Sequence, residues 1–210
     1  MAELRISHYV DETKVLGPFV RSALWVHGCC FNCEGCLAKE MNSREYKAAD
    51  AEKLAEHFLS VKDTDGITIS GGEPFLQAEA LSLMIRRIRD TRPDYGVIIY
   101  TGFTFEELKD KNNASTYEML GMADIIIDGR YVKELDDGVP YRGSSNQRIL
   151  LLTDRYKDIS KEYYNTSGKR NIEIQVTGKN IYMVGVPSEN GLKIWEDLER
   201  KAEVSGNNGL

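Results

Sequence analysis

Continuous apolar runs, separated by amphipathic segments, recur along most of this chain. They occupy residues 22–27, 67–70, 97–100, 123–128 and 148–152, and each run predicts a short strand. Apolar runs without polar alternation are typical of parallel strands that are buried on both faces, and parallel strands are joined by helical crossovers. The sequence therefore predicts an α/β fold built of βαβ units.

The length of the chain limits the size of that fold. A complete eight-unit barrel needs ~250 residues, whereas the chain has 210. We therefore expect residues 1–153 to form a partial (β/α)6 TIM-like barrel of mostly parallel strands, with a flavodoxin-like layered sheet as the alternative. Further on, residues 172–176 and 181–184 predict a β-hairpin, and residues 190–203 predict a short helix. Residues 154–210 are thus expected to form a C-terminal extension.

Several helix ends can be predicted from local sequence. Asp50 is a good N-cap for a helix over residues 50–61, and Arg92-Pro93 should end the helix that begins near Leu81. Thr104-Phe-Glu-Glu107 has the pattern of a capping box.

Charge and hydropathy exclude several classes of partner. The formal net charge is −6, which offers no electrostatic footprint for nucleic acid or for an anionic membrane. No apolar run approaches the ~20 residues of a membrane-spanning helix, and the polar N-terminus MAELRISHYVDETK lacks the apolar core of a signal peptide. We expect a cytoplasmic protein with neither a nucleic-acid nor a membrane partner.

All four cysteines lie within eight residues, at Cys29, Cys30, Cys33 and Cys36. A disulfide framework spreads its cysteines along the chain, so this cluster indicates a metal or iron–sulfur site. The spacing Cys29-x3-Cys33-x2-Cys36 supplies three thiolates, because adjacent Cys30 cannot usually reach the same cubane. Three thiolates on a [4Fe–4S] cubane leave one iron open, as in a catalytic site. The alternative is zinc held by the three cysteines and His27 or water.

A second motif, Gly71-Gly72-Glu73-Pro74, directly follows the predicted strand 67–70. Paired glycines let a ligand approach the backbone closely, and Glu73 can accept a hydrogen bond from an ammonium group. Free backbone groups at the C-terminal end of a parallel strand can bind a small polar ligand. The alternative is a structural strand-to-helix turn with Pro74 at the first helical position.

The two motifs together resemble those of the radical S-adenosylmethionine (radical SAM) enzymes. Four further segments extend the match: 17–21 (GPFVR), which leads into the cysteine loop, and then 100–103 (YTGF), 127–130 (IDGR) and 141–148 (YRGSSNQR). In so short a chain, this set resembles the anaerobic ribonucleoside-triphosphate reductase activating proteins over roughly residues 5–152.

The resemblance implies which residues bind the cofactors. Cys29, Cys33 and Cys36 would hold three irons of a [4Fe–4S] cluster, and the amino and carboxylate groups of S-adenosylmethionine would chelate the fourth. One electron from the cluster would then yield methionine and a 5′-deoxyadenosyl radical. The remaining cofactor-binding residues would be Gly35, Cys36 and Leu37 beside the adenosyl portion, Gly71, Gly72 and Glu73 beside the methionine amino group, and Thr101.

The resemblance also implies an enzyme, a radical SAM oxidoreductase that takes a hydrogen atom from a glycine of a large partner. That partner would be a glycyl radical enzyme such as anaerobic ribonucleotide reductase, or else a peptide substrate, with a flavodoxin- or ferredoxin-type electron donor. One alternative is a small radical SAM enzyme that modifies another protein or peptide. An alternative of a different class is a non-catalytic iron–sulfur electron carrier.

Other side chains are weaker candidates. Asp128 and Arg130 follow a predicted strand, where they would be catalytic residues lining the channel for the target glycine, or else a solvated salt bridge. The remaining candidates are Arg21, Arg142 and Arg148, which could neutralise acidic groups of a partner, and Tyr182 and Trp195, expected in the core or an interface.

Overall fold

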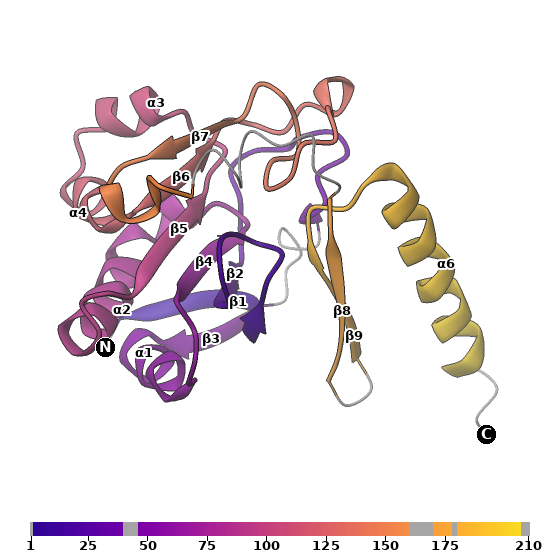
Figure 1. Ribbon diagram of the computed structural model, residues 1–210, viewed down its shortest axis with the longest axis horizontal. Helices are drawn as coiled ribbons and strands as arrows, with labels where there is room; N and C mark the ends of the chain where they lie inside the picture. The colour runs from indigo at the N-terminus through magenta and orange to yellow at the C-terminus, as the bar shows by residue number, and fades with distance from the viewer. Residues whose placement is uncertain (1, 40–45, 160–169, 178–179, 207–210) are drawn as a thin grey trace.

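The computed structural model describes residues 2–39, 46–159, 170–177 and 180–206. A seven-stranded sheet forms its centre, in the order β3-β1-β2-β4-β5-β6-β7 (Figure 1). Its strands are β1 (Glu3–Thr13), β2 (Arg21–Val26), β3 (Lys47–Asp50), β4 (Gly66–Gly71), β5 (Gly96–Tyr100), β6 (Ile125–Asp128) and β7 (Arg148–Leu151). A separate hairpin of β8 (Ile172–Thr177) and β9 (Asn180–Gly185) precedes helix α6 (Glu189–Gly206).

The sheet confirms the α/β fold and the C-terminal hairpin and helix, but it does not show a six-unit barrel. Strands β2, β4, β5 and β6 run parallel, whereas β1 pairs antiparallel with both β2 and β3, and β7 pairs antiparallel with β6. Only three crossovers therefore join parallel strands. Within the described part of the chain, β3 and β7 are open edges and the sheet is not closed.

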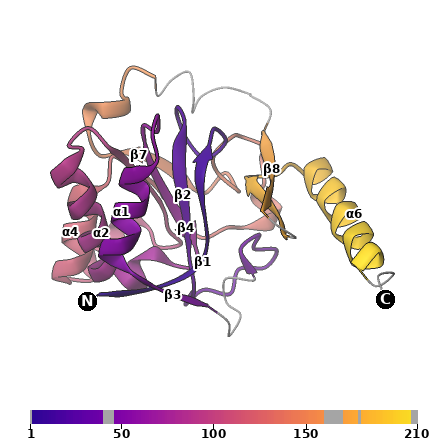
Figure 2. The same cartoon turned by 90° about the horizontal axis from the view of Figure 1, so that it is seen from below.

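The helices that connect the parallel strands cover one face of the sheet. Helices α1 (Ala51–Ser60), α2 (Ala78–Thr91) and α4 (Ala114–Met122), with short α3 (Phe105–Asp110), connect the parallel strands in turn. Because the strand order advances in one direction, right-handed crossovers place the helices on one side, where α2 packs between α1 and α4 (Figures 1 and 2). The flavodoxin-like alternative, with helices on both faces, is therefore wrong for the described residues.

Local sequence sets the helix ends. The Asp50 side chain accepts from the backbone N–H groups of Glu52 and Lys53, which confirms the predicted N-cap. Thr104 and Glu107 form the reciprocal capping box, and α2 ends at Thr91, just before Arg92-Pro93. Helix α4 was not predicted, although the Asn113 side chain caps it in the same way.

Both faces of the parallel strands are buried, as their apolar runs predict. Leu24, Ile69 and Ile99 belong to the core cluster beneath the helices. On the opposite face, Tyr156 packs with Ile98, and residues of the C-terminal hairpin pack beside β1 and β2. The face of the sheet opposite the helices is thus covered in part by segments after residue 153.

Candidate functional site

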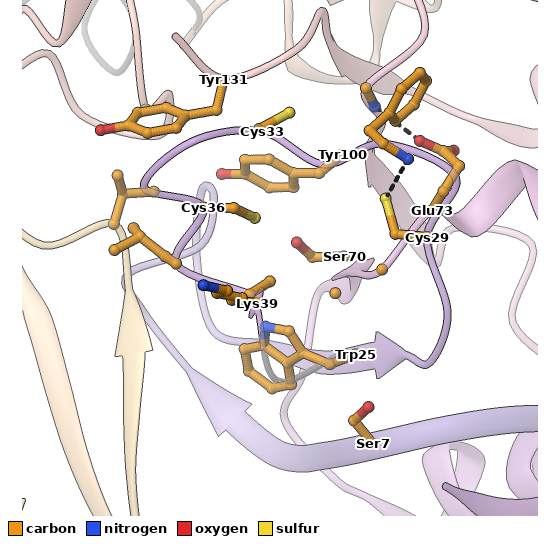
Figure 3. Close-up of a pocket in the computed structure, with 18 of the residues that line it drawn as sticks. Ser7, Trp25, Cys29, Cys33, Cys36, Lys39, Ser70, Glu73, Tyr100 and Tyr131 are labelled. Carbon is orange, nitrogen blue, oxygen red and sulfur yellow. Dashed lines mark hydrogen bonds between the residues drawn. The ribbon is translucent and has the colours of Figure 1, made fainter. Parts of the chain in front are cut away.

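A cavity of about 700 Å³ lies beyond the C-terminal ends of the parallel strands (Figure 3). Trp25, Ser70 and Tyr100 line it from the sheet face that lies away from the helices. Parallel strands bring the loops that follow them to one edge of a sheet, so the cysteine loop and the Gly-Gly turn meet there. The predicted site residues that line it are Cys29, Cys33, Cys36, Leu37, Gly71, Gly72, Glu73, Thr101 and Arg130.

The cysteine loop presents three thiols to this cavity. Cys29, Cys33 and Cys36 are half-buried in its wall, whereas Cys30 is exposed and is not a lining residue. In the described part of the chain, no three His, Cys, Asp or Glu side chains converge as the ligands of one metal ion would. Thiolates are ligands of both iron–sulfur clusters and zinc, so these three thiols alone fit either group.

Burial favours the protonated form of two of these thiols, Cys29 and Cys36. Burial is the main cause that raises the pKa of Cys29 to about 11, and the Phe31 backbone N–H, 3.4 Å from its sulfur, only partly opposes this. Burial also raises the pKa of Cys36. Because thiolates are the form that binds iron, loading the site must release protons.

His27 does not complete a zinc site. The side chain is buried, its Nδ1 atom lies 3.1 Å from the Ser7 hydroxyl, and it is not among the residues that line the cavity. Its backbone N–H donates to the Arg5 carbonyl. These contacts give His27 a structural role between β1 and β2, and they count against zinc held by the three cysteines and His27.

The Gly-Gly turn is bonded directly to the start of the cysteine loop. Gly72 N–H donates to the Val26 carbonyl and Glu73 N–H to the Gly28 carbonyl, each at 2.8 Å. Gly71 has φ of 101°, and a Cβ atom on Gly72 would collide with the Gly28 carbonyl oxygen. Glycine is therefore required at both positions by the protein itself, before any ligand is considered.

Glu73 is fully buried and ties this turn to the end of β5. One carboxylate oxygen accepts from Phe75 N–H and from the Thr101 hydroxyl, both at 2.9 Å, and the other accepts from Gly102 N–H at 2.8 Å. Burial nevertheless dominates and raises the pKa of Glu73 to about 7. Pro74 opens a short 3₁₀ helix, so the structural reading of the motif holds beside the ligand-binding one.

The raised pKa of Glu73 predicts a loss of stability with rising pH. The folded protein binds the Glu73 proton up to pH about 7, whereas the unfolded chain releases it near 4.5. The folded state therefore holds more protons in this window, and the free energy of unfolding should fall by up to about 3 kcal/mol as pH rises through it. Urea unfolding of the wild type and of Glu73→Gln at several pH values measures this: the variant should lack that part of the slope, and parallel curves would contradict the assignment.

Asp128 is placed differently from the sequence-based expectation. It is buried, it does not line the cavity, and its carboxylate accepts from Phe105 N–H at 2.7 Å and from Arg148 Nε at 3.0 Å. Arg148 also pairs with Glu106 at 2.6 Å. Asp128 and Arg148 thus hold β6, β7 and the start of α3 together, and the Asp128 carboxylate is occupied by these partners.

Arg130 does reach the cavity. Its guanidinium lies 4.7 Å from the centre of the Phe31 ring and 3.4 Å from a Glu107 carboxylate oxygen. Phe31 itself packs edge-on against Phe103, with ring centres 4.7 Å apart. Arg130 is therefore positioned to hold the cysteine loop against the loop after β5.

The segment 141–148, marked by the sequence RGSSNQR, supports the loop after β6. The Gln147 side chain donates to the Gly129 carbonyl and the Asn146 side chain to the Arg130 carbonyl, both at 2.8 Å. The buried Ser144 hydroxyl accepts from Val132 N–H at 3.1 Å. These polar side chains make hydrogen bonds to backbone groups of the loop after β6, which lies in the cavity wall. Their role is therefore to position that loop.

The remaining candidates separate into buried and lining residues. Arg21 is fully buried among Thr68, Pro18 and Tyr156, so it is unavailable to a partner. Arg142 pairs with Asp137.

Some aromatic residues that line the cavity were not expected there. Tyr182 and Trp195 were expected in the core or an interface, and Tyr131 was not singled out from the sequence. Gly35 is exposed, with φ of 70°.

Several known proteins are similar to this chain over about two thirds of its length. A 4Fe-4S single cluster domain matches residues 15–150. The anaerobic ribonucleoside-triphosphate reductase-activating protein of Enterobacteria phage T4 is 34% identical over 146 residues, which cover 67% of this chain and 89% of the relative. Proteins of the same name from Vibrio cholerae and Escherichia coli K12 are 32% and 30% identical, covering 66% and 64% of this chain and 92% and 90% of the relatives.

None of the helices in the described residues is both long enough and apolar enough to cross a membrane.

Proposed function

The chain belongs to the 4Fe-4S single cluster domain family and to the anaerobic ribonucleoside-triphosphate reductase-activating proteins, and on that basis we propose that it generates a glycyl radical on such a reductase. Residues 1–153 would carry this activity, with residues 154–210 as an extension. The single observation that best supports the proposal is that the three cysteines and the Gly71–Glu73 turn line one cavity.

The residues of the wall have distinct proposed roles. Cys29, Cys33 and Cys36 would hold three irons, and the turn Gly71–Glu73 would bind the methionine amino group of S-adenosylmethionine. When bound and reduced, the cluster would supply the one electron that cleaves the sulfonium bond of S-adenosylmethionine into methionine and a 5′-deoxyadenosyl radical. Gly35 and Leu37 flank Cys36, where the adenosyl portion would lie. Apolar lining side chains such as Trp25 and Leu37 would help to keep water from the reacting groups.

Glu73 and Thr101 have a supporting role in this proposal. Three donors from the protein already occupy the Glu73 carboxylate. Thr101 is bonded to that carboxylate, and its hydroxyl also accepts from Phe103 N–H at 3.1 Å. We therefore assign Glu73 and Thr101 mainly to shaping the turn that receives the methionine group. Arg130 is proposed to act through Phe31 and the cysteine loop, and Asp128 through Arg148 and α3.

The test is direct production of the glycyl radical. The anaerobically reconstituted protein, S-adenosylmethionine, a reductant and the anaerobic reductase of the same organism should together give a doublet glycyl signal in electron paramagnetic resonance. A flavodoxin- or ferredoxin-type protein is the proposed physiological reductant, and dithionite replaces it in the assay. Omission of S-adenosylmethionine should abolish the signal.

The alternatives give different results in the same assay. Formation of 5′-deoxyadenosine without any glycyl signal would replace the activase with an enzyme that modifies another protein or peptide. A cluster whose spectrum does not respond to S-adenosylmethionine, together with no 5′-deoxyadenosine, would indicate an electron carrier.

A further inference from the structure

The C-terminal extension is fixed to the rest of the protein by a buried arginine. The Arg170 side chain is only 2% exposed and pairs with Asp136 at 2.8 Å. Its other donors reach the Pro187 carbonyl at 3.1 Å and three carbonyls of the loop 139–143, at 2.8–3.2 Å. Separating a buried charged side chain from its ion-pair and hydrogen-bond partners costs much free energy. The hairpin therefore begins from a fixed point beside the cavity.

One face of the hairpin packs against β1. The Glu173 carboxylate accepts from the Thr13 hydroxyl at 2.7 Å and from Lys14 N–H at 2.9 Å. The Tyr182 ring stacks on His8 with centroids 3.7 Å apart, and Val184 is buried beside Val10 and Leu16. These contacts make the hairpin a permanent wall of the cavity.

The other face of the hairpin is apolar and largely uncovered. Ile174 pairs with Met183 and Val176 with Ile181, and directly paired residues of an antiparallel ladder share a face. Val176 is 69% exposed, Ile174 42% and Ile181 38%. Ile181 and Met183 also line the cavity. The apolar face is therefore continuous with the cavity that contains the cysteines.

The exposed charges at the cavity mouth are cationic, although the chain is acidic. Lys39, Lys47 and Arg130 are the exposed charged residues among the described ones that line the cavity. The acidic residue in that wall, Glu73, is fully buried. Apolar Leu37 and Tyr46 are exposed beside the two lysines. The mouth therefore favours a ligand that carries both apolar and acidic groups.

We propose that the uncovered hairpin face and the lysine-bearing rim together dock the reductase, through a segment of its chain that carries apolar and acidic side chains next to the target glycine. This inference rests on the proposed function and adds the surface that selects the partner. The matched single-cluster domain ends at residue 150, so the hairpin is outside it. A second copy of this chain is a poorer occupant, because the same face of that copy would present lysines rather than acidic groups to this rim.

The test measures how the glycyl signal depends on the reductase concentration, using the reconstituted full-length protein. Val176→Glu and Lys39→Glu should each raise the half-saturating reductase concentration at least tenfold, since each places a negative charge where an acidic segment binds. Both side chains are exposed, so folding should be unaffected. Sedimentation of the mixture should show the same loss of association without relying on turnover.

Two matched substitutions serve as controls. Leu83→Glu alters a leucine with 38% exposure on α2, among the helices, and Lys62→Glu alters an exposed lysine just before β4, at the opposite end of the parallel strands from the cysteine loop. Both should stay within twofold of the wild type.

Three results would contradict the proposed docking surface, and a fourth would contradict the proposed function instead. Unchanged half-saturation in Val176→Glu and Lys39→Glu would refute it, and so would equal effects in the two controls. Self-association of the wild type that Val176→Glu abolishes would assign the face to a second copy instead. Cleavage of S-adenosylmethionine without a glycyl signal in the wild type would contradict the proposed function itself.

Discussion

Replacing Cys29, Cys33 or Cys36 by alanine should reduce the iron bound after anaerobic reconstitution from about four per chain to background. Each of these cysteines lines the cavity, and a cubane with only two protein thiolates loses the chelation that holds it. Iron analysis, together with the visible absorption of the cluster, measures the effect. The folded state should persist in all three variants, because the half-buried thiols contribute little packing.

Cys30→Ala is the matched control for these variants. Cys30 is exposed and is not among the residues that line the cavity, so the cluster should form at wild-type iron content. Equal loss of iron in all four variants would contradict the three-ligand assignment. Retention of the cluster in Cys33→Ala or Cys36→Ala would mean that Cys30 can act as a ligand.

Gly72→Val should unfold the turn rather than merely obstruct a ligand. The sequence alone predicts that this change weakens binding of S-adenosylmethionine by at least ~1–3 kcal/mol and spares the cluster, because the cluster ligands follow another strand. The structure changes that expectation, because the added Cβ atom would collide with the Gly28 carbonyl oxygen, next to Cys29. Backbone cannot yield as a side-chain rotamer can, so we expect more than ~3 kcal/mol of destabilisation and loss of both the cluster and cofactor binding.

Gly121→Ala is the control for that substitution. Gly121 lies in α4, and nothing lies within 4 Å of the position its Cβ atom would take. Alanine there should stabilise the protein by roughly 0.5–1 kcal/mol, since glycine is a poor helix former. Chemical denaturation measures both stabilities, and calorimetry with S-adenosylmethionine measures binding. A Gly72→Val protein that keeps its cluster and its stability but no longer binds S-adenosylmethionine would show that the substitution only obstructs the ligand.

The parts of the fold that sequence predicted well are those set by local interactions. Strands β2, β4, β5 and β6 can each be recognised from their own continuous apolar runs. The helix caps at Asp50 and Thr104 can likewise be recognised from their own few residues. Strand β1 was missed because its buried and exposed residues alternate over a polar sequence. The direction of β7 depends on its partner across the sheet, which no local pattern encodes. The barrel prediction assumed mostly parallel strands. The antiparallel direction of β7 could not be predicted, and the observed sheet is open.

The candidate site divides in the same way. The three cysteines and the Gly-Gly turn were found from spacing alone, because short loops after neighbouring parallel strands necessarily meet. Asp128 was expected in the substrate channel, but its strand end is covered by Arg148, which comes from β7 twenty residues later. The lining role of Tyr182 and Trp195 also lay beyond prediction, since it depends on how the hairpin and α6 sit beside the cysteine loop.

The hairpin that completes the cavity wall has a consequence for the order of assembly. The bond between Thr13 and Glu173 joins residues 160 positions apart, so the wall is in place only after the hairpin strands β8 and β9 have been made. Domains generally fold from the N-terminus during synthesis. The sheet and the cysteine loop can therefore form while one side of the cavity is still open, which leaves an interval in which iron and sulfide reach the thiols before the enclosure is finished.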